Sequence, residues 1–237
     1  SFFKFINKVI SFIKIFMHMI INKLNAIDNE IQLKIKELNI LKLVPKVIAV
    51  SKTFGMSKIL PLINYGHVHF GENKVQESLE KWTDIKNDFK HINLHMLGKI
   101  QTNKAKYVVD LFDYIHSLDN RKLAEKISVE QEKKKKKLKI FIQVNIANED
   151  QKAGVSLEDL DDFYHYCIKK LKLDIVGLMC LPPNKKKPDM YFKKMSELRD
   201  ILGVEDLSMG MSGDYLEAIK YGSTFVRIGS KIFGQRY

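Results

Sequence analysis

Short apolar segments recur along the chain at intervals that suit buried strands. From residue 47 onward there are eight of them, each three to five residues long and rich in Val, Ile, Leu and Phe. Runs of this length, bounded by polar residues, are typical of strands that are buried on both faces of a sheet. They lie at residues 47–50, 68–70, 94–97, 114–116, 140–144, 175–179, 207–209 and 225–228.

Longer segments with helical spacing separate these runs. They cover residues 57–65, 73–82, 102–111, 121–132, 157–171, 189–202 and 215–221, with a last turn from residue 230. Helix starts are predicted at the capping residues Ser57, Asp119, Ser156 and Ser212, and helix ends just before Gly66, Gly203 and Gly222. Eight strands that alternate with helices in a chain of this length predict an α/β fold, a single (β/α)8 TIM barrel.

An open, doubly wound sheet is the alternative arrangement of alternating strands and helices. Such a sheet usually has fewer strands, and its first strand leads into a glycine-rich loop that binds phosphate. The first predicted strand is followed by residues 51–55, Ser-Lys-Thr-Phe-Gly, which do not form a loop of that kind. The barrel is therefore favoured over the open sheet.

The first 42 residues are expected to form a helical extension ahead of the barrel, which then spans residues 43–237. Apolar side chains are so frequent in residues 2–21 that a helix there must bury them against the barrel, a partner subunit or a membrane surface. Lys4, Lys8 and Lys14 interrupt them, so the segment lacks the ~18 uncharged apolar residues of a membrane span. Because the sequence starts at Ser1, a targeting segment for an organelle is left open.

Composition indicates a globular protein of a reducing compartment. The chain has 237 residues, of which 45% are hydrophobic, enough for a full-sized core. Its two cysteines, Cys167 and Cys180, have neither the spacing of a metal site nor that of a disulfide framework, so no metal is expected. A cytoplasmic location is predicted on this basis.

A net charge of +12 raises the question of nucleic-acid binding. Only four of the 40 basic residues are arginines, whereas specific recognition of phosphates and bases relies on the arginine fork. The lysine run at 133–137 is predicted to be a solvated insertion in a loop. No specific nucleic-acid partner is therefore expected, and a basic surface that binds RNA is the weaker alternative.

Lys52 stands at the end of the first predicted strand, where barrel active sites form. Burial at the mouth of a barrel lowers the pKa of an amine, and an unprotonated amine forms a Schiff base with an aldehyde. The alternative is an ordinary surface lysine just past a strand, which is common in a lysine-rich chain. A second cluster, near the other end of the sequence, favours the functional interpretation.

That cluster occupies the loops after the seventh and eighth predicted strands. Many barrels bind phosphate at these two loops. Gly210, Ser212, Gly229 and Ser230 fall on them; glycine lets a phosphate approach the backbone N–H groups, and serine adds a hydroxyl donor. Ordinary loops with helix-capping serines are the alternative for either loop alone, but both loops together predict an anion site.

A ligand with an aldehyde at one end and a phosphate at the other fits this arrangement, and pyridoxal 5′-phosphate (PLP) is such a molecule. Arg227 ends the eighth predicted strand and could address the pyridine nitrogen of PLP. Because guanidinium only donates hydrogen bonds, it would keep that nitrogen unprotonated and weaken the cofactor as an electron sink. A salt bridge at the barrel rim is the alternative role for Arg227.

Several segments of the chain resemble the pyridoxal phosphate homeostasis protein family. The resemblance runs from about residue 46 to residue 237 and does not cover the apolar extension. It rests on Ile48-Ala49-Val50-Ser51-Lys52, Phe70-Gly71-Glu72-Asn73-Lys74-Val75-Gln76-Glu77, Gly98-Lys99-Ile100-Gln101-Thr102-Asn103-Lys104, Lys152-Ala153-Gly154, Gly177-Leu178-Met179, Leu207-Ser208-Met209-Gly210-Met211-Ser212 and Val226-Arg227-Ile228-Gly229-Ser230.

The resemblance implies a single barrel similar to the N-terminal domain of alanine racemase, and a non-catalytic carrier or regulator of vitamin B6 pools. It implies a Schiff base on Lys52, phosphate binding by Ser212, Gly229 and Ser230, and contact of Arg227 with the pyridine nitrogen. Asn73 and Met179 are implied to line the cofactor pocket. PLP-dependent apo-enzymes are the implied recipients of the cofactor.

A PLP-dependent, racemase-like enzyme is the alternative to a carrier. Racemisation requires two bases on opposite faces of the substrate carbanion, of which Lys52 supplies one. In alanine racemase the second base is a tyrosine from a separate domain, and no counterpart of that domain is expected after the barrel. His95 and Tyr215 are conceivable substitutes within the barrel. The carrier is favoured, so no catalytic residue is predicted.

Overall fold

A closed parallel barrel forms the body of the protein, in a computed structural model that describes residues 2–149, 153–183 and 187–235. Within these ranges eight strands pair in sequence order and β1 closes the barrel against β8. The prediction of a (β/α)8 barrel is confirmed. The strands are β1 (Lys46–Val50), β2 (His69–Glu72), β3 (Asn93–Met96), β4 (Tyr114–Leu118), β5 (Lys139–Val144), β6 (Asp174–Cys180), β7 (Asp206–Met211) and β8 (Phe225–Ile228).

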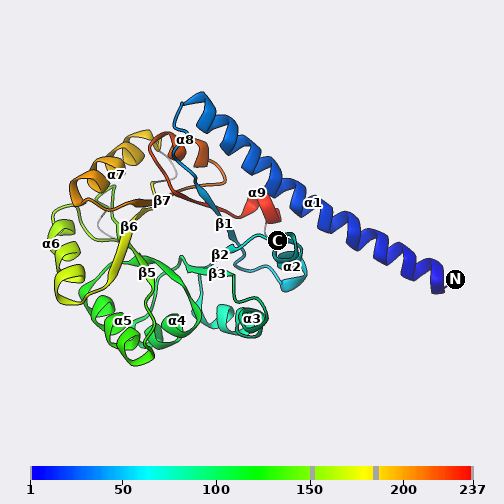
Figure 1. The fold of residues 1–237 in the computed structure, drawn as a ribbon, viewed down its shortest axis with the longest axis horizontal. Helices are drawn as coiled ribbons and strands as arrows, with labels where there is room; N and C mark the ends of the chain where they lie inside the picture. Colours follow the sequence, from blue (N-terminus) through cyan, green and yellow to red (C-terminus); the bar gives the residue numbers. More distant parts are fainter. Residues whose placement is uncertain (1, 150–152, 184–186, 236–237) are drawn as a thin grey trace.

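A helical segment follows every strand and lies on the outside of the barrel (Figure 1). The helices are α1 (Phe2–Glu37), α2 (Met56–Tyr65), α3 (Val75–Asp88), α4 (Ala105–Leu111), α5 (Arg121–Lys134), α6 (Leu160–His165), α7 (Asp189–Leu202), α8 (Tyr215–Lys220) and α9 (Ser230–Phe233). A 3-10 turn, η1 (Thr102–Lys104), precedes α4, and a π-helical turn, η2 (Tyr166–Lys170), extends α6.

Helix ends agree better with prediction than helix starts. Gly66, Gly203 and Gly222 all follow helices with positive φ, at 99°, 67° and 83°, so the predicted left-handed positions are confirmed. The predicted starts at Ser57, Asp119 and Ser212 are wrong, because the cap positions there are Gly55, Asn120 and Asp214. Ser156 makes the predicted capping bond, since its hydroxyl accepts from the Asp159 N–H at 3.0 Å, although α6 itself begins at Leu160. Asn120 is the N-cap of α5, and its side chain accepts a hydrogen bond from the Leu123 N–H at 2.9 Å.

The lysine run at 133–137 is only partly the loop that the sequence predicts. Lys133 and Lys134 form the last turn of α5, where cations interact favourably with the negative end of the helix dipole. Lys135 then ends the helix in the left-handed region, with φ of 50°. Lys152, which belongs to one of the motifs above, lies outside the described residues.

Helix α1 runs along the outside of the barrel and packs against α2, α8 and α9 (Figure 1). One face of its second half is buried, at Ile20, Leu24, Ile27, Ile31 and Ile35, and joins the same hydrophobic core as the barrel helices. Full burial of one such side chain stabilises the fold by about 1.5–3 kcal/mol. The N-terminal part of α1 projects beyond the barrel.

Helix α1 also raises the question of membrane insertion, because of the apolar residues in its first half. Among the described residues, none of the helices has the length and apolarity that a membrane crossing requires.

Apolar and aromatic side chains fill the inside of the barrel. Ile48, Tyr114, Phe141, Met179 and Phe225 form one buried cluster there. The inward positions alternate along each strand with outward ones, which pack under the surrounding helices. The barrel is therefore a filled core, and its C-terminal end is left as the place for a site.

Candidate functional site

A cavity of about 910 Å³ opens at the C-terminal ends of the barrel strands. All seven residues that the sequence assigns to a cofactor site are among those that line it: Lys52, Asn73, Met179, Ser212, Arg227, Gly229 and Ser230. The fold brings them together because the ends of parallel strands meet at one rim of a barrel. Their proximity is a property of the structure, while their individual roles stay predictions.

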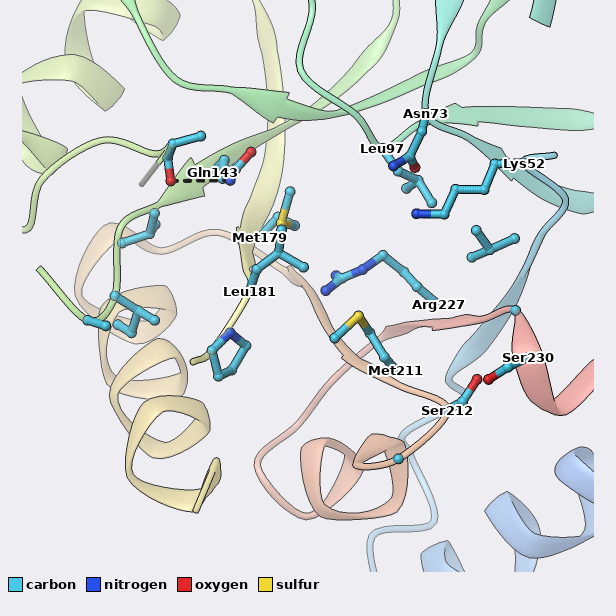
Figure 2. A pocket seen from close by; sticks show the side chains of 18 of the residues that line it. Lys52, Asn73, Leu97, Gln143, Met179, Leu181, Met211, Ser212, Arg227 and Ser230 are labelled. Atoms are coloured by element: carbon cyan, nitrogen blue, oxygen red, sulfur yellow. Dashed lines mark hydrogen bonds between the residues drawn. The ribbon is translucent and has the colours of Figure 1, made fainter. Parts of the chain in front are cut away.

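Lys52 reaches the cavity from the turn that follows β1. In Figure 2 its side chain and that of Asn73 point from one side of the cavity toward Arg227. Asn73 follows β2, so these two side chains come from neighbouring strand ends. The amine of Lys52 and the guanidinium of Arg227 thus share one chamber.

Ser212 and Ser230 face one another across the two loops after β7 and β8, and their hydroxyl oxygens are turned together in Figure 2. The Ser212 hydroxyl accepts a hydrogen bond from the Lys231 N–H at 3.4 Å. Asp214 shapes the first loop, because its carboxylate accepts a hydrogen bond from the Met211 N–H at 2.6 Å. No role for Asp214 was predicted from the sequence, although an acidic side chain that reaches back to the N–H three residues before it is the pattern of a capping box.

Gly210 is required where the chain leaves β7 for the serine loop. Its φ is +90°, in the region that favours glycine, and a Cβ at this position would lie 2.6 Å from the Ala218 Cβ. Any side chain here would displace α8 from the barrel. Glycine at this position therefore fixes how closely the loop before Ser212 approaches the cavity.

Arg227 is buried, at 5% exposed, and its guanidinium is held by hydrogen bonds to residues of β6 and β7. It donates to the carbonyl and hydroxyl oxygens of Ser208, at 2.6 Å and 2.8 Å, and to the Cys180 carbonyl at 2.9 Å. Burial lowers the pKa of the guanidinium, and the nearby Cys180 and Asp214 oppose that shift. These three hydrogen bonds orient the Arg227 guanidinium, and its remaining N–H groups can still donate to a ligand in the cavity.

A chain of three histidines continues from Ser208 through the inside of the barrel. His116 Nδ1 lies 2.8 Å from the Ser208 hydroxyl, His95 Nδ1 lies 2.9 Å from His116 Nε2, and His69 Nδ1 lies 2.9 Å from His95 Nε2. Since Arg227 only donates, the Ser208 hydroxyl donates to His116, and each ring then donates through Nε2 to the next.

Burial keeps these histidines neutral. It lowers the pKa of His69 to about 4, and it lowers the pKa values of His95 and His116 well below 6.5, helped by neighbouring positive charge. The sequence left His95 open as a second base, but its side chain is fully buried and is not among the residues that line the cavity.

Metal and thiol chemistry find no support among the described residues. They contain no group of three or more His, Cys, Asp or Glu side chains placed to hold a metal ion. Cys167 and Cys180 are both buried and unpaired, and burial raises the pKa of each thiol to about 12. Neither thiol is therefore activated as a nucleophile.

The class of protein follows from comparison with known families. The family model described as the N-terminal domain of alanine racemase matches residues 24–237. Alanine racemase from Corynebacterium glutamicum shares this fold at a TM-score of 0.62, with 12% identity over 88% of this chain and 61% of that chain. The chain is thus a barrel of the alanine racemase N-terminal class.

Nearer relatives define the family within that class. Pyridoxal phosphate homeostasis proteins are 38% identical in Aquifex aeolicus, over 81% of this chain and 87% of that protein, and 35% identical in Haemophilus influenzae, over 91% and 95%. The structure of PipY from Synechococcus elongatus with PLP bound is 31% identical, with a TM-score of 0.73, over 86% of this chain and all of that one. The chain belongs to the pyridoxal phosphate homeostasis protein family.

Proposed function

We propose that this protein binds PLP and serves in its homeostasis, holding the cofactor as a Schiff base on Lys52 without catalytic turnover. The observation that carries the proposal is one cavity with an amine on one side, a pair of serine hydroxyls on another and a donor-only arginine on a third. The PLP-bound structure of PipY, a relative with the same fold, supports the choice of ligand.

The side chains that line the cavity fit the chemical groups of PLP. Ser212, Gly229 and Ser230 would bind the phosphate, since two hydroxyls and an open backbone supply donors. Arg227, already oriented by Ser208, would donate to the pyridine nitrogen. Lys52 would then meet the aldehyde, while Asn73 and Met179 line the cavity around the ring.

The absence of a second base supports a carrier over an enzyme. Of the described residues that line the cavity, only Lys52 and Arg227 have side chains that titrate, and Arg227 stays a donor. His95 is enclosed in the histidine chain, and the Tyr215 hydroxyl donates to Glu30 on α1. Arg227 would also leave the cofactor a weak electron sink. A racemase-like enzyme, the alternative, would need a base from outside this cavity.

Two measurements test the proposal. PLP should give the purified protein a visible absorption band that Lys52→Ala removes. Solvent deuterium exchange at Cα, followed by mass spectrometry over a panel of L- and D-amino acids, should proceed no faster than with free PLP. Steady exchange that needs Lys52 would replace the carrier by a racemase-like enzyme, and an unchanged band in Lys52→Ala would remove the Schiff base from the proposal.

The cellular role and location of the protein also stay proposals. Transfer of PLP to PLP-dependent apo-enzymes, a cytoplasmic location and contact of residues 1–42 with a membrane surface are expectations from the sequence. The division into an extension, residues 1–42, and a barrel, residues 43–237, is likewise a proposal, in which the buried face of α1 is the contact between the two.

A further inference from the structure

The backbone around Lys52 is in a conformation that its own residues do not favour. The Phe54 N–H donates to the Ser51 carbonyl at 3.1 Å, which closes a β-turn with Lys52 and Thr53 at its centre. Thr53 has φ of +67°, in the left-handed region. Turns of this kind place Gly or Asn there, and a β-branched residue at positive φ is an outlier that persists only where surrounding contacts outweigh its strain.

Contacts from α3 hold the strained residue. The Thr53 N–H donates to Glu77 Oε1 at 2.6 Å, and Lys81 Nζ donates to the same oxygen at 2.9 Å. Lys81 Nζ also donates to the Ser51 carbonyl at 3.0 Å. Glu77 and Lys81 are four residues apart and therefore lie on one face of α3, which is turned toward the Lys52 turn.

A buried carboxylate on β2 completes the arrangement. Glu72 is fully buried, and its Oε1 accepts from the Ser51 hydroxyl at 2.7 Å, from Lys81 Nζ at 2.9 Å and from the Trp82 indole at 2.9 Å. We name Glu72, Glu77 and Lys81 the Lys81 cluster. It binds the residue before Lys52 and the residue after it, so the lysine is fixed from both sides.

We propose that the Lys81 cluster positions Lys52, with Glu77 as the group that sustains the strained conformation of Thr53. The proposal rests on the Schiff base proposed above. None of the cluster's three residues is among the described residues that line the cavity, so they act through the backbone of the turn. Their effect should therefore concern the aldehyde of the ligand, which Lys52 meets, and not its phosphate or ring.

Two ligands separate positioning from general structural support. PLP carries the aldehyde; pyridoxine 5′-phosphate has the same ring and phosphate with an alcohol in its place. Glu77→Ala should weaken PLP binding about tenfold, equal to 1.4 kcal/mol, and change pyridoxine 5′-phosphate binding less than about twofold. Glu80→Ala, which removes an exposed carboxylate from the same helix, is the matched control and should change neither affinity.

A second substitution tests whether Glu77 acts on Lys52 by stabilising the strained backbone of Thr53. Glycine adopts positive φ at no steric cost, so a turn with Gly at position 53 no longer needs the bond to Glu77. Thr53→Gly added to Glu77→Ala should return PLP affinity to within about twofold of the original protein. A loss of PLP affinity that Thr53→Gly does not repair would overturn the proposal.

The remaining outcomes are equally decisive. Equally weakened binding of both ligands in Glu77→Ala, or unchanged binding of both, would contradict positioning.

If Glu77→Ala does not fold, Glu77→Gln replaces it. An amide keeps an acceptor but loses the charge that attracts Lys81, so only PLP binding should weaken, by about threefold. The preference for PLP over pyridoxine 5′-phosphate can also be lost in Lys52→Ala and kept in the Glu77 variants. That result would refute this inference and leave the Schiff base on Lys52 unaffected. An unaltered preference in Lys52→Ala would instead refute the proposed function.

Discussion

Ser212→Ala should weaken PLP binding without weakening the fold. The Ser212 hydroxyl is partly exposed, and its bond from the Lys231 N–H, at 3.4 Å, is long for an N–H···O hydrogen bond. Removal of such a group changes the free energy of unfolding by less than about 0.5 kcal/mol. The effect of the mutation should therefore be visible only when the ligand is present.

With the phosphate in place the same hydroxyl would donate to an anion. A hydrogen bond to a charged group contributes about 1.5–3 kcal/mol, so its loss should weaken PLP binding about ten- to a hundredfold. Ser230→Ala should have a similar effect, because its hydroxyl faces that of Ser212 across the same loops. Backbone N–H donors survive both changes, so binding should fall without disappearing.

The assay compares PLP with pyridoxal, which has the aldehyde and ring but no phosphate. Both are titrated into the original protein, into the double variant Ser212→Ala with Ser230→Ala, and into Ser57→Ala, which removes an exposed serine from α2. The double variant should lose most of its preference for PLP and bind pyridoxal as before. A preference for PLP equal to that of the original protein would refute the phosphate assignment.

Two further predictions concern stability. Leu24→Ala, on the buried face of α1, should lower the free energy of unfolding by about 2–5 kcal/mol in urea denaturation. Leu33→Ala removes a side chain that is 68% exposed on the same helix and should lower it by less than about 0.5 kcal/mol. Equal effects of the two substitutions would contradict the packing of α1. Burial lowers the pKa of His67 and His69 to about 4, so between pH 6.5 and 4 only the unfolded chain gains these protons. As the pH is lowered through this range, the free energy of unfolding should decrease, by up to about 1.4 kcal/mol per pH unit for each histidine. A free energy of unfolding that is the same at pH 7 and pH 5 would refute this prediction.

The barrel and its rim could be predicted because they depend on local pattern. Each strand is a short apolar run, and a closed parallel barrel brings the residues after those runs to one end whatever their separation in sequence. Lys52 and Ser230 could thus be placed in one site, although 178 residues apart, without knowledge of any side-chain contact. Strand ends agreed within about two residues for the same reason.

What the sequence did not reveal depends on register and on side-chain direction. His95 lies inside the barrel because the pairing of β3 with β2 and β4 turns it inward, next to His69 and His116. Glu77 acts on Thr53 because one face of α3 is turned toward the β1 turn, which no local motif encodes. Threonine itself concealed the positive φ at that turn, since the usual signal is Gly or Asn.

Lys52 is the residue on which the proposed Schiff base with PLP depends. Borohydride reduction of the PLP-loaded protein, followed by proteolysis and mass-spectrometric peptide mapping, identifies the lysine that carries the cofactor. We expect one dominant adduct, on Lys52, and no adduct of comparable yield elsewhere among the 36 lysines. An adduct found mainly on another lysine, such as Lys36 near the end of α1, would contradict the account.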